Sequence, residues 1–229
     1  MVSKGLMAAW TFLDACLLVA GAVSIALSFV WRKPDILMNM VLSNADLTAG
    51  LILGITLVIT FVFSVGAIVQ RNHVTMGLVI LNYLLILCAI GILIIGTFVW
   101  VYTLRERDNF HEVYSKVPST TRAFIQDKFS CCGYFNAADF VEPSNFCNPT
   151  QISFMNALDA SDVNNSQFFC VTPVTKFADV TLNNIFTTVY GFMAIVLALL
   201  LATLCVINMR NEEERFKRID AKRGGRGFV

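Results

Sequence analysis

Four long apolar runs limit what this chain can fold into. They cover residues 6–30, 47–69, 74–101 and 185–207. An α-helix rises about 1.5 Å per residue, so roughly 20 residues cross the hydrocarbon core of a bilayer, and every run is longer than that. Hydrophobic residues make up 56% of the chain and charged residues only 14%, whereas a soluble domain carries about 25% charge. The sequence therefore predicts an all-α membrane protein with four transmembrane helices.

The first run has one alternative interpretation, a cleaved signal peptide, because Ala20-Gly21-Ala22 resembles a small-residue cleavage site. The apolar core of a signal peptide is usually about 7 to 15 residues long, and the run 6–30 is clearly longer. We therefore expect this run to remain in the protein as a membrane span. A mature chain beginning near Val23 would contradict that expectation.

Basic residues beside the spans predict the orientation, because short cytoplasmic segments carry an excess of Lys and Arg. With a cytoplasmic N-terminus, the inner side holds Lys4, Arg71 and a basic tail, against only Arg32 and Lys33 in the short outer loop. We therefore expect both termini in the cytoplasm. The predicted segments are cytoplasmic at 1–5, 70–73 and 208–229, and extracellular at 31–46 and 102–184.

Four of the seven cysteines lie in the large loop: Cys131, Cys132, Cys147 and Cys170. Four cysteines in an extracellular module are typical of two disulfides formed in an oxidising compartment. A bond between the adjacent Cys131 and Cys132 would strain disulfide geometry, which leaves two possible pairings. A zinc site is disfavoured, because adjacent cysteines are poorly spaced to bind one tetrahedral ion. Gly133 can adopt backbone angles that send the two sulfurs in different directions.

The remaining pattern of the large loop predicts a helical stalk with an irregular head. The third run is expected to continue as a helix until Pro118, and a second helix is expected directly after it. Pro173 opens another helical stretch that leads into the fourth run. Between Gly133 and Thr172 no periodicity is sustained, and Pro, Asn and Ser residues indicate turns. Asn164 opens an N-glycosylation sequon in this segment.

With these features in place, the chain resembles the tetraspanins. The resemblance rests on four spans, a short and then a large outer loop, the inner turn 70–73, and Cys131-Cys132-Gly133 placed after a helix. Pro143-Ser144-Asn145-Phe146-Cys147 is loosely similar to the family's Pro-x-Ser-Cys, and Cys170 lies where the last loop cysteine is found. The resemblance covers nearly the whole chain.

The resemblance implies a disulfide-stapled large extracellular loop in which Cys131 pairs with Cys170 and Cys132 pairs with Cys147. The sequence Cys-Cys-Gly-Tyr-Phe-Asn at 131–136 and the short head look most like fungal tetraspanins needed for host penetration. The chain also departs from the family pattern. Spans three and four lack the acidic residues of many members, and only Cys205 lies near the inner surface as a candidate for palmitoylation.

Asp14 is the one ionisable residue deep in a span, and such residues are functional candidates because a charge in hydrocarbon is costly. Asp14 lies eight residues beyond Leu6, and Asn82 lies eight beyond Val74. Both therefore sit about 12 Å from the cytoplasmic start of their spans. We expect a hydrogen bond between Asp14 and Asn82 that joins two helices, with a proton or ion pathway as the alternative role.

Small residues recur within several spans, and small residues let helix backbones approach closely in lipid. Packing within the chain is expected in preference to a dimerisation face. The pairs and series are Gly50 and Gly54, then Ala194, Ala198 and Ala202, and finally Ala8, Ala15 and Ala22.

The sequence shows no catalytic constellation. Its two histidines, His73 and His111, are expected on opposite sides of the membrane and cannot share a site. No phosphate loop, nucleophile elbow or metal-ligand spacing occurs, so we predict a non-enzymatic protein without cofactor or metal. The formal net charge of +1 excludes a globally basic nucleic-acid binder.

The resemblance and the aromatic head together indicate a membrane organiser that binds partner membrane proteins in cis. Aromatic residues of the irregular segment 134–169 are candidate contacts, because interfaces use them as anchors, although about half should fill the head's own core. The candidates are Phe140, Phe146, Phe154, Phe168 and Phe169. Lipid, including a sterol, between the spans and a second copy of the chain are further candidate partners. The expected location is the plasma membrane or an endosomal or vacuolar membrane.

Two other functions are open to a four-span protein. A small transporter or channel would use Asp14 and Asn82, but the spans hold few polar groups and show no internal repeat. A claudin-like junction protein would carry its large disulfide loop after the first span, whereas here the loop follows the third.

Overall fold

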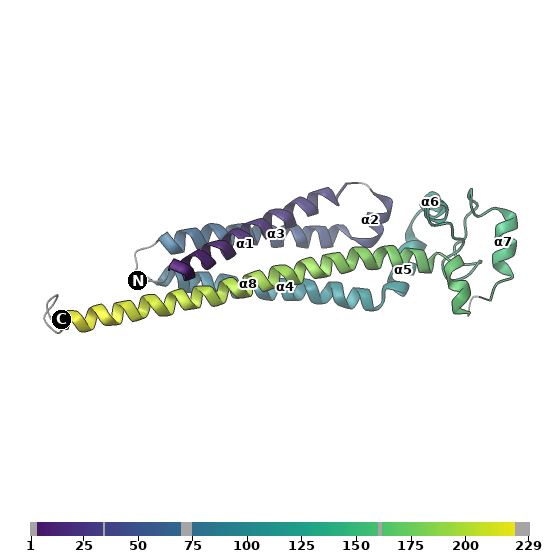
Figure 1. Ribbon diagram of the computed structural model, residues 1–229. Coiled ribbons are helices and arrows are strands. Elements are labelled where there is room, and N and C mark those ends of the chain that lie inside the picture. The colour runs from purple at the N-terminus through teal and green to yellow at the C-terminus, as the bar shows by residue number, and fades with distance from the viewer. Residues whose placement is uncertain (1–3, 34, 70–74, 160–161, 223–229) are drawn as a thin grey trace. The chain divides into compact units, whose positions relative to one another are not determined.

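The computed structural model describes residues 4–33, 35–69, 75–159 and 162–222. These residues form helices and no strand, so the predicted all-α fold class is confirmed (Figure 1). The helices long and apolar enough to cross a membrane are α1 (Lys4–Val30), α3 (Asn44–Val69), α4 (Met76–Leu104) and α8 (Val171–Lys222). The shorter helices are α2 (Ile36–Val41), α5 (Glu106–Lys116), α6 (Ser119–Phe129), α7 (Pro149–Asn156) and the 3-10 helix η1 (Val163–Phe168).

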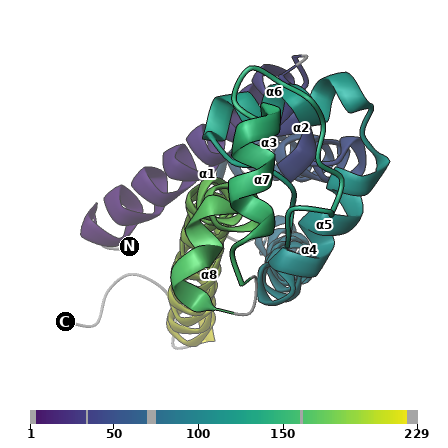
Figure 2. The ribbon, with the colours of Figure 1, turned by 90° about the vertical axis from the view of Figure 1, so that its right-hand side faces the viewer.

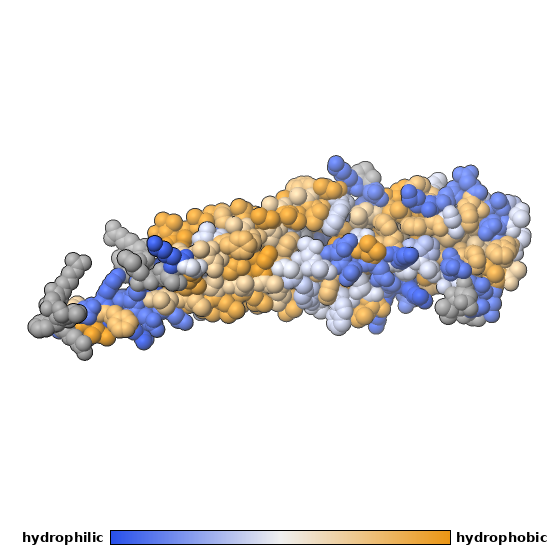
Figure 3. Space-filling model, in the orientation of Figure 1, coloured by the Kyte–Doolittle hydropathy of each residue, from blue (hydrophilic) through white to orange (hydrophobic). Residues whose placement is uncertain are grey.

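The chain divides into two compact units. The four-helix unit takes its described residues from 1–30, 48–96 and 188–229, and the loop unit consists of residues 31–47 and 97–187. Hydrophobic side chains cover much of the visible surface of the four-helix unit (Figure 3). Such a surface suits contact with lipid and not with water. The predicted inner turn 70–73 lies outside the described residues.

Small residues bring α1 and α3 together in the four-helix unit. A Cβ atom on Gly54 would lie 2.7 Å from Cγ1 of Ile25 and 3.0 Å from the backbone oxygen of Gly21. Nearby, the Ser24 hydroxyl donates a hydrogen bond of 3.4 Å to the backbone oxygen of Gly50. Because an added Cβ would collide at Gly54 and lie only 3.2 Å from the Ser28 hydroxyl at Gly50, this pair of glycines packs against α1 within the chain, as predicted.

Polar contacts join the other helices of this unit. The indole Nε1 of Trp10 in α1 donates a 3.1 Å hydrogen bond to the Thr203 hydroxyl in α8. At the end of α3, Nη2 of the buried Arg210 donates a 3.1 Å hydrogen bond to the backbone oxygen of Ile68. The last carbonyls of a helix lack partners within the helix, so the Arg210 cation caps α3 and opposes its dipole.

The helix expected to continue from the third span to Pro118 is interrupted, which corrects the prediction. The α4 helix ends at Leu104 and α5 begins at Glu106, with Arg105 between them in a non-helical conformation. The side-chain amide of Asn109 donates a 3.0 Å hydrogen bond to the backbone oxygen of Tyr102. This hydrogen bond satisfies a carbonyl at the end of α4. The Tyr102 carbonyl therefore has a partner although the helix is interrupted.

The segment expected to be irregular contains a helix that the sequence reading missed. The α7 helix begins at Pro149, and the side chain of Asn148 accepts a 2.8 Å hydrogen bond from the backbone N–H of Gln151. Asparagine before proline is a helix-start signal, because Asn caps and Pro suits the first helical position. Figure 2 shows α6 and α7 joined by chain without regular structure.

The α8 helix is longer than the span and the stretch before it. It runs without interruption from Val171 to Lys222 and so includes much of the predicted tail. The tail portion carries a Glu214–Arg218 ion pair of 2.7 Å, four residues apart on one face. Such pairs support exposed helices, and no glycine or proline occurs between Asn211 and Lys222 to end this one.

Candidate functional site: the disulfide-linked loop

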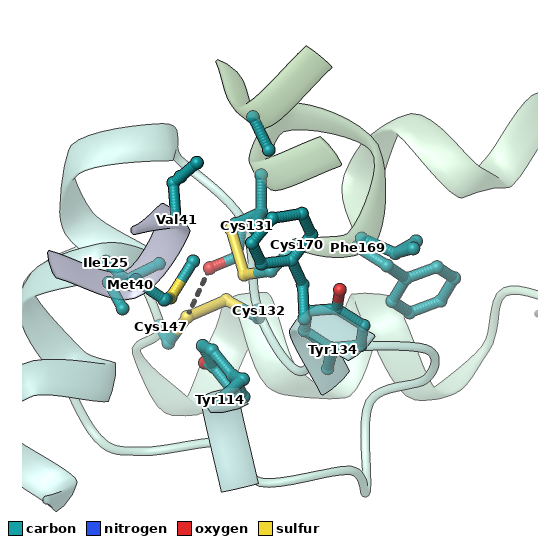
Figure 4. Close-up of a cluster of buried hydrophobic side chains, with 14 of the residues drawn as sticks. Met40, Val41, Tyr114, Ile125, Cys131, Cys132, Tyr134, Cys147, Phe169 and Cys170 are labelled. Atoms are coloured by element: carbon teal, nitrogen blue, oxygen red, sulfur yellow. Dashed lines mark hydrogen bonds between the residues drawn. A yellow bond between two sulfur atoms is a disulfide. The ribbon is translucent and has the colours of Figure 1, made fainter. Parts of the chain in front are cut away.

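Two disulfides lie at the centre of the loop unit. Cys131 is bonded to Cys170 with a Cα–Cα distance of 5.0 Å, and Cys132 to Cys147 with a distance of 5.7 Å. These are the pairs that the resemblance implies. All four cysteines are buried, and Figure 4 shows them surrounded by Tyr114, Tyr134 and Phe169.

Gly133 allows the chain to turn directly after the cysteine pair. Its φ is +73°, and a Cβ atom there would collide with the backbone oxygen of Asn136. The backbone oxygen of Gly133 accepts a 2.9 Å hydrogen bond from the N–H of Cys170, and that of Tyr134 accepts a 3.2 Å bond from Val171. Only glycine adopts this conformation without strain, so Gly133 lets one disulfide and two backbone bonds form side by side.

The short loop, residues 31–46, contributes side chains to the core of the loop unit. This contribution was not predicted from the sequence. Asp35 caps α2 by accepting hydrogen bonds from the N–H groups of Leu37 and Met38, at 3.0 and 3.2 Å. Met40 and Val41 of α2 are buried in the same cluster as the disulfides (Figure 4). Residues of the segments 31–47 and 97–187 therefore share one core.

Gln126 is a fully buried polar residue whose side chain is satisfied on both ends. Its Nε2 donates to the Tyr114 hydroxyl at 2.9 Å and to the backbone oxygen of Phe140 at 3.2 Å. Its Oε1 accepts the backbone N–H of Glu142 at 3.2 Å. Gln126 thereby fixes residues 140–142 against α6. Burial raises the pKa of Tyr114 to about 12, so its hydroxyl stays neutral at physiological pH.

Arg122 holds the same segment from the other side. Its Nε and Nη2 donate to Oε1 of Glu142 at 2.9 and 2.6 Å, and its Nη1 donates to the backbone oxygen of Val117 at 2.7 Å. The guanidinium also lies 5.6 Å from the ring centre of Phe140. Phe140 has a φ of +52°, a conformation that non-glycine residues rarely adopt. The contacts from Arg122 and Gln126 compensate for that strain.

His111 lies within an aromatic cluster and contacts a carboxylate. Its Nε2 is 3.0 Å from Oδ2 of Asp139, and its ring lies 4.8 Å from that of Phe135 and 5.1 Å from that of Tyr134. Asp139 also accepts the backbone N–H of Phe135 at 3.1 Å. These contacts attach the turn after Gly133 to α5.

The structure separates the predicted aromatic contacts into exposed and buried residues. Phe140 is 40% exposed and Phe154 is 48% exposed, whereas Phe146 and Phe168 are partly buried against the core. Phe169 is only 1% exposed, so its assignment as a partner contact is wrong. Phe169 directly precedes Cys170, and the disulfide draws it inward.

The two polar residues predicted to meet within the membrane are both buried in the four-helix unit. Asp14 is 3% and Asn82 is 9% exposed. The predicted hydrogen bond between them is not among the hydrogen bonds of the described residues, and Oδ1 of each side chain is buried without a partner there. The residue next to the Asp14 carboxyl is Ser64 of α3. The position of a residue along a helix gives its depth but not the direction in which its side chain points.

The other predicted sites fall on accessible or undescribed positions. Cys205 is an exposed free thiol, and Cys16 and Cys88 are partly buried. Asn164 lies in η1, and its side chain is outside the described part of the structure. Within the described ranges, no group of three or more His, Cys, Asp or Glu residues could hold a metal ion.

Comparison with known proteins assigns the family. The model of the Tetraspanin family matches residues 5–209, which is most of the chain. Searches of curated proteins and of solved structures gave no match. The family match does not favour the transporter or channel hypothesis. Four apolar helices, two loop disulfides and this match place the chain, a multi-pass membrane protein, in the tetraspanin family.

Proposed function

We propose that this protein is a non-enzymatic membrane organiser that binds partner membrane proteins laterally through its loop unit. The observation that carries this function is the pair of exposed aromatic residues, Phe140 and Phe154, on a unit whose own core is already filled. Large exposed aromatic side chains are costly in water and are enriched among the residues that dominate interface affinity.

Phe140 is the stronger of the two anchors. The hydrogen bond from Gln126 to its backbone oxygen and the nearby Arg122 guanidinium fix the segment that carries it. A residue held in its binding position loses little conformational entropy on association. Phe154 projects from α7, and its ring packs 5.9 Å from that of Phe168.

The finer parts of the function concern topology and modification. Both termini are cytoplasmic, in the plasma membrane or an endosomal or vacuolar membrane, as the distribution of Lys and Arg supports. Asn164 carries an N-linked glycan, and the exposed Cys205 is palmitoylated. Sterol between the spans and a second copy of the chain are further partners. The sequence around Cys131 supports a role in fungal infection-related morphogenesis.

Crosslinking mass spectrometry on native membranes tests the partner surface. In the full-length chain, Phe140→Ser and Phe154→Ser together should abolish crosslinks between the loop unit and other membrane proteins, without changing membrane insertion. The matched control is Phe124→Ser, because Phe124 is similarly exposed but lies on α6, outside the segment 134–169. Partner crosslinks that persist in the double variant would overturn the assignment.

A further inference from the structure

The final stretch of α8 is a helix whose surface is left uncovered by the rest of the described chain. The helix continues without interruption to Lys222, and every residue from Arg215 to Lys222 is exposed. Figure 1 shows this end of α8 extending beyond the nearest ends of α1, α3 and α4, which belong to the same unit. Its side chains are therefore available to another molecule.

Two large apolar side chains lie on one side of this stretch. Phe216 is 65% exposed and Ile219 is 45% exposed. Alternating steps of three and four residues lead back from Ile219 through Phe216, Glu212 and Met209 to Cys205. This is the heptad spacing by which two helices pack side by side, and only Glu212 departs from its apolar character. These five residues are called the α8 seam.

The α8 seam does not face the helices of its own unit. At about 100° per residue, the α8 residues buried in the four-helix unit are centred roughly 130° around the helix from the seam. Met209 of the seam is partly buried, and the other four seam residues are exposed. A second helix can therefore reach the seam while α8 stays packed in its unit. The buried residues compared are Leu199, Thr203, Val206 and Arg210.

The charged residues that flank the α8 seam have opposite signs on its two sides. Arg215 and Lys222 flank one side, and Glu213 and Asp220 flank the other. Neither Arg215 nor Asp220 has an ion-pair partner among the described residues. The seam therefore has one basic and one acidic edge.

A second copy of this chain supplies the matching charges. In a parallel helix pair of this kind, a residue beside the seam meets the residue five positions further along the other helix. Arg215 of each copy therefore meets Asp220 of the other. Copies inserted the same way in one membrane lie parallel, as this contact requires. An antiparallel pair would instead bring each basic edge against the other basic edge.

The membrane surface lies too far away to cover the apolar end of the seam. Phe216 is nine residues beyond Ile207, the last residue of the fourth predicted span. Nine residues of uninterrupted helix cover about 14 Å, whereas the headgroup layer is roughly 5 to 8 Å thick. The usual helix tilt of about 20° shortens that distance only slightly. Phe216 and Ile219 therefore lie beyond the headgroups, where another protein is the molecule that covers them.

We propose that two copies of this chain pair in parallel through the α8 seam, with Arg215 of each copy against Asp220 of the other. Glu212 is the one charged residue of the seam, and such a residue restricts the register of the pair at a cost in stability. The inference rests on the proposed function only in taking a second copy as a partner. It does not use the loop surface at Phe140 and Phe154, so either assignment can fail alone.

Charge exchange in the full-length chain tests the pairing. Copies labelled at the N-terminus with a donor or an acceptor dye are reconstituted together in liposomes, and energy transfer is followed as the chain is diluted with lipid. Arg215→Asp and Asp220→Arg should each weaken self-association about fivefold, because like charges then meet at both contacts. The double variant should recover the wild-type value. A double variant as weak as the single variants, or a wild type without concentration-dependent transfer, would overturn the proposal.

The seam itself gives a test in the opposite direction. Glu212→Leu replaces two facing carboxylates with an apolar contact, so self-association should become about fivefold stronger. Phe216→Ser together with Ile219→Ser should weaken it. Glu214→Leu is the matched control, because it puts the same side chain on the far side of the same helix, and it should leave self-association unchanged. Equal strengthening by both leucines would show that the seam is not the contact.

Crosslinking in native membranes distinguishes a second copy from a different protein. In a Cys205→Ser background, Ile219→Cys places a thiol in the seam, and Ala221→Cys places one on the far side. Mild oxidation should join two copies of the chain through position 219 and not through position 221. A link from position 219 to a different protein, without a link between copies, would assign the seam to that protein and contradict the proposed pairing.

Discussion

The four-helix unit and the loop unit are stabilised by different interactions. In the four-helix unit, glycines let α1 and α3 touch, and hydroxyl groups bond mainly to carbonyls of their own helix, as Thr60 does to Thr56 at 2.8 Å. In the loop unit, two disulfides, a buried glutamine and aromatic rings in tilted contact hold short helices together. Lipid offers no hydrophobic drive between helices, whereas a small unit in water needs crosslinks to supplement a small core.

The largest expected effect is removal of the long-range disulfide from the loop unit. Cys131→Ser with Cys170→Ser opens a crosslink between residues 39 positions apart, and loss of a native disulfide costs about 2 to 5 kcal/mol in a small domain. Hydrogen exchange in detergent should show loss of protection in the loop unit alone. If α1 and α3 also lost protection, the two units would not differ as described.

The next largest effect is expected at the buried glutamine. Gln126→Leu leaves the Tyr114 hydroxyl, the Phe140 oxygen and the Glu142 N–H without this partner, which should cost about 3 kcal/mol in total. Chemical denaturation monitored in the loop unit measures it. Gln167→Leu is the control, because Gln167 is exposed and should tolerate the change. Equal stability of the two variants would show that the hydrogen bonds contribute little.

A substitution in the four-helix unit makes the complementary test. Gly54→Leu places a side chain where Ile25 and the Gly21 backbone already lie, and overpacking of this kind costs about 1 to 3 kcal/mol. Gly66→Leu adds the same side chain to the same helix where, apart from that helix's own backbone and the adjacent residues, no atom lies within 4 Å of the added Cβ. Thermal denaturation in detergent should separate the two variants. Similar melting of both would argue against close packing of α1 on α3.

The smallest expected effect is a pH dependence confined to the loop unit. The pKa of Glu106 is raised from 4.5 to about 7 in the folded state, so the folded state binds its proton more tightly than the unfolded state. The corresponding stability is fully present below about pH 4.5 and is lost as the pH rises through about 7. Denaturation midpoints measured across this range should fall for the wild type and stay level for Glu106→Gln. A slope that Glu106→Gln leaves unchanged would assign it to another group.

The sequence predicts features that depend on local composition and misses those that depend on distant neighbours. Hydropathy is a local property, so the four apolar helices follow from it. The break at Arg105, the burial of Phe169 and the entry of Met40 into the loop core depend on contacts with residues far along the chain. The residue positions place Asp14 and Asn82 at the same depth along their helices. They do not predict the direction in which each side chain points. Only α7 had a local signal, Asn148-Pro149, that could have revealed it.

The left-handed backbone conformation at Phe140 lowers the stability of the fold, whereas the exposed ring at the same position is proposed to bind partners. A glycine would adopt a φ of +52° without strain, so Phe140→Gly should relieve roughly 1 kcal/mol of conformational energy while deleting an exposed ring. Variants selected only for thermal robustness would therefore drift toward glycine there and lose their affinity for other proteins. Retention of an aromatic residue at that position under such selection would mark the ring itself as the property being preserved.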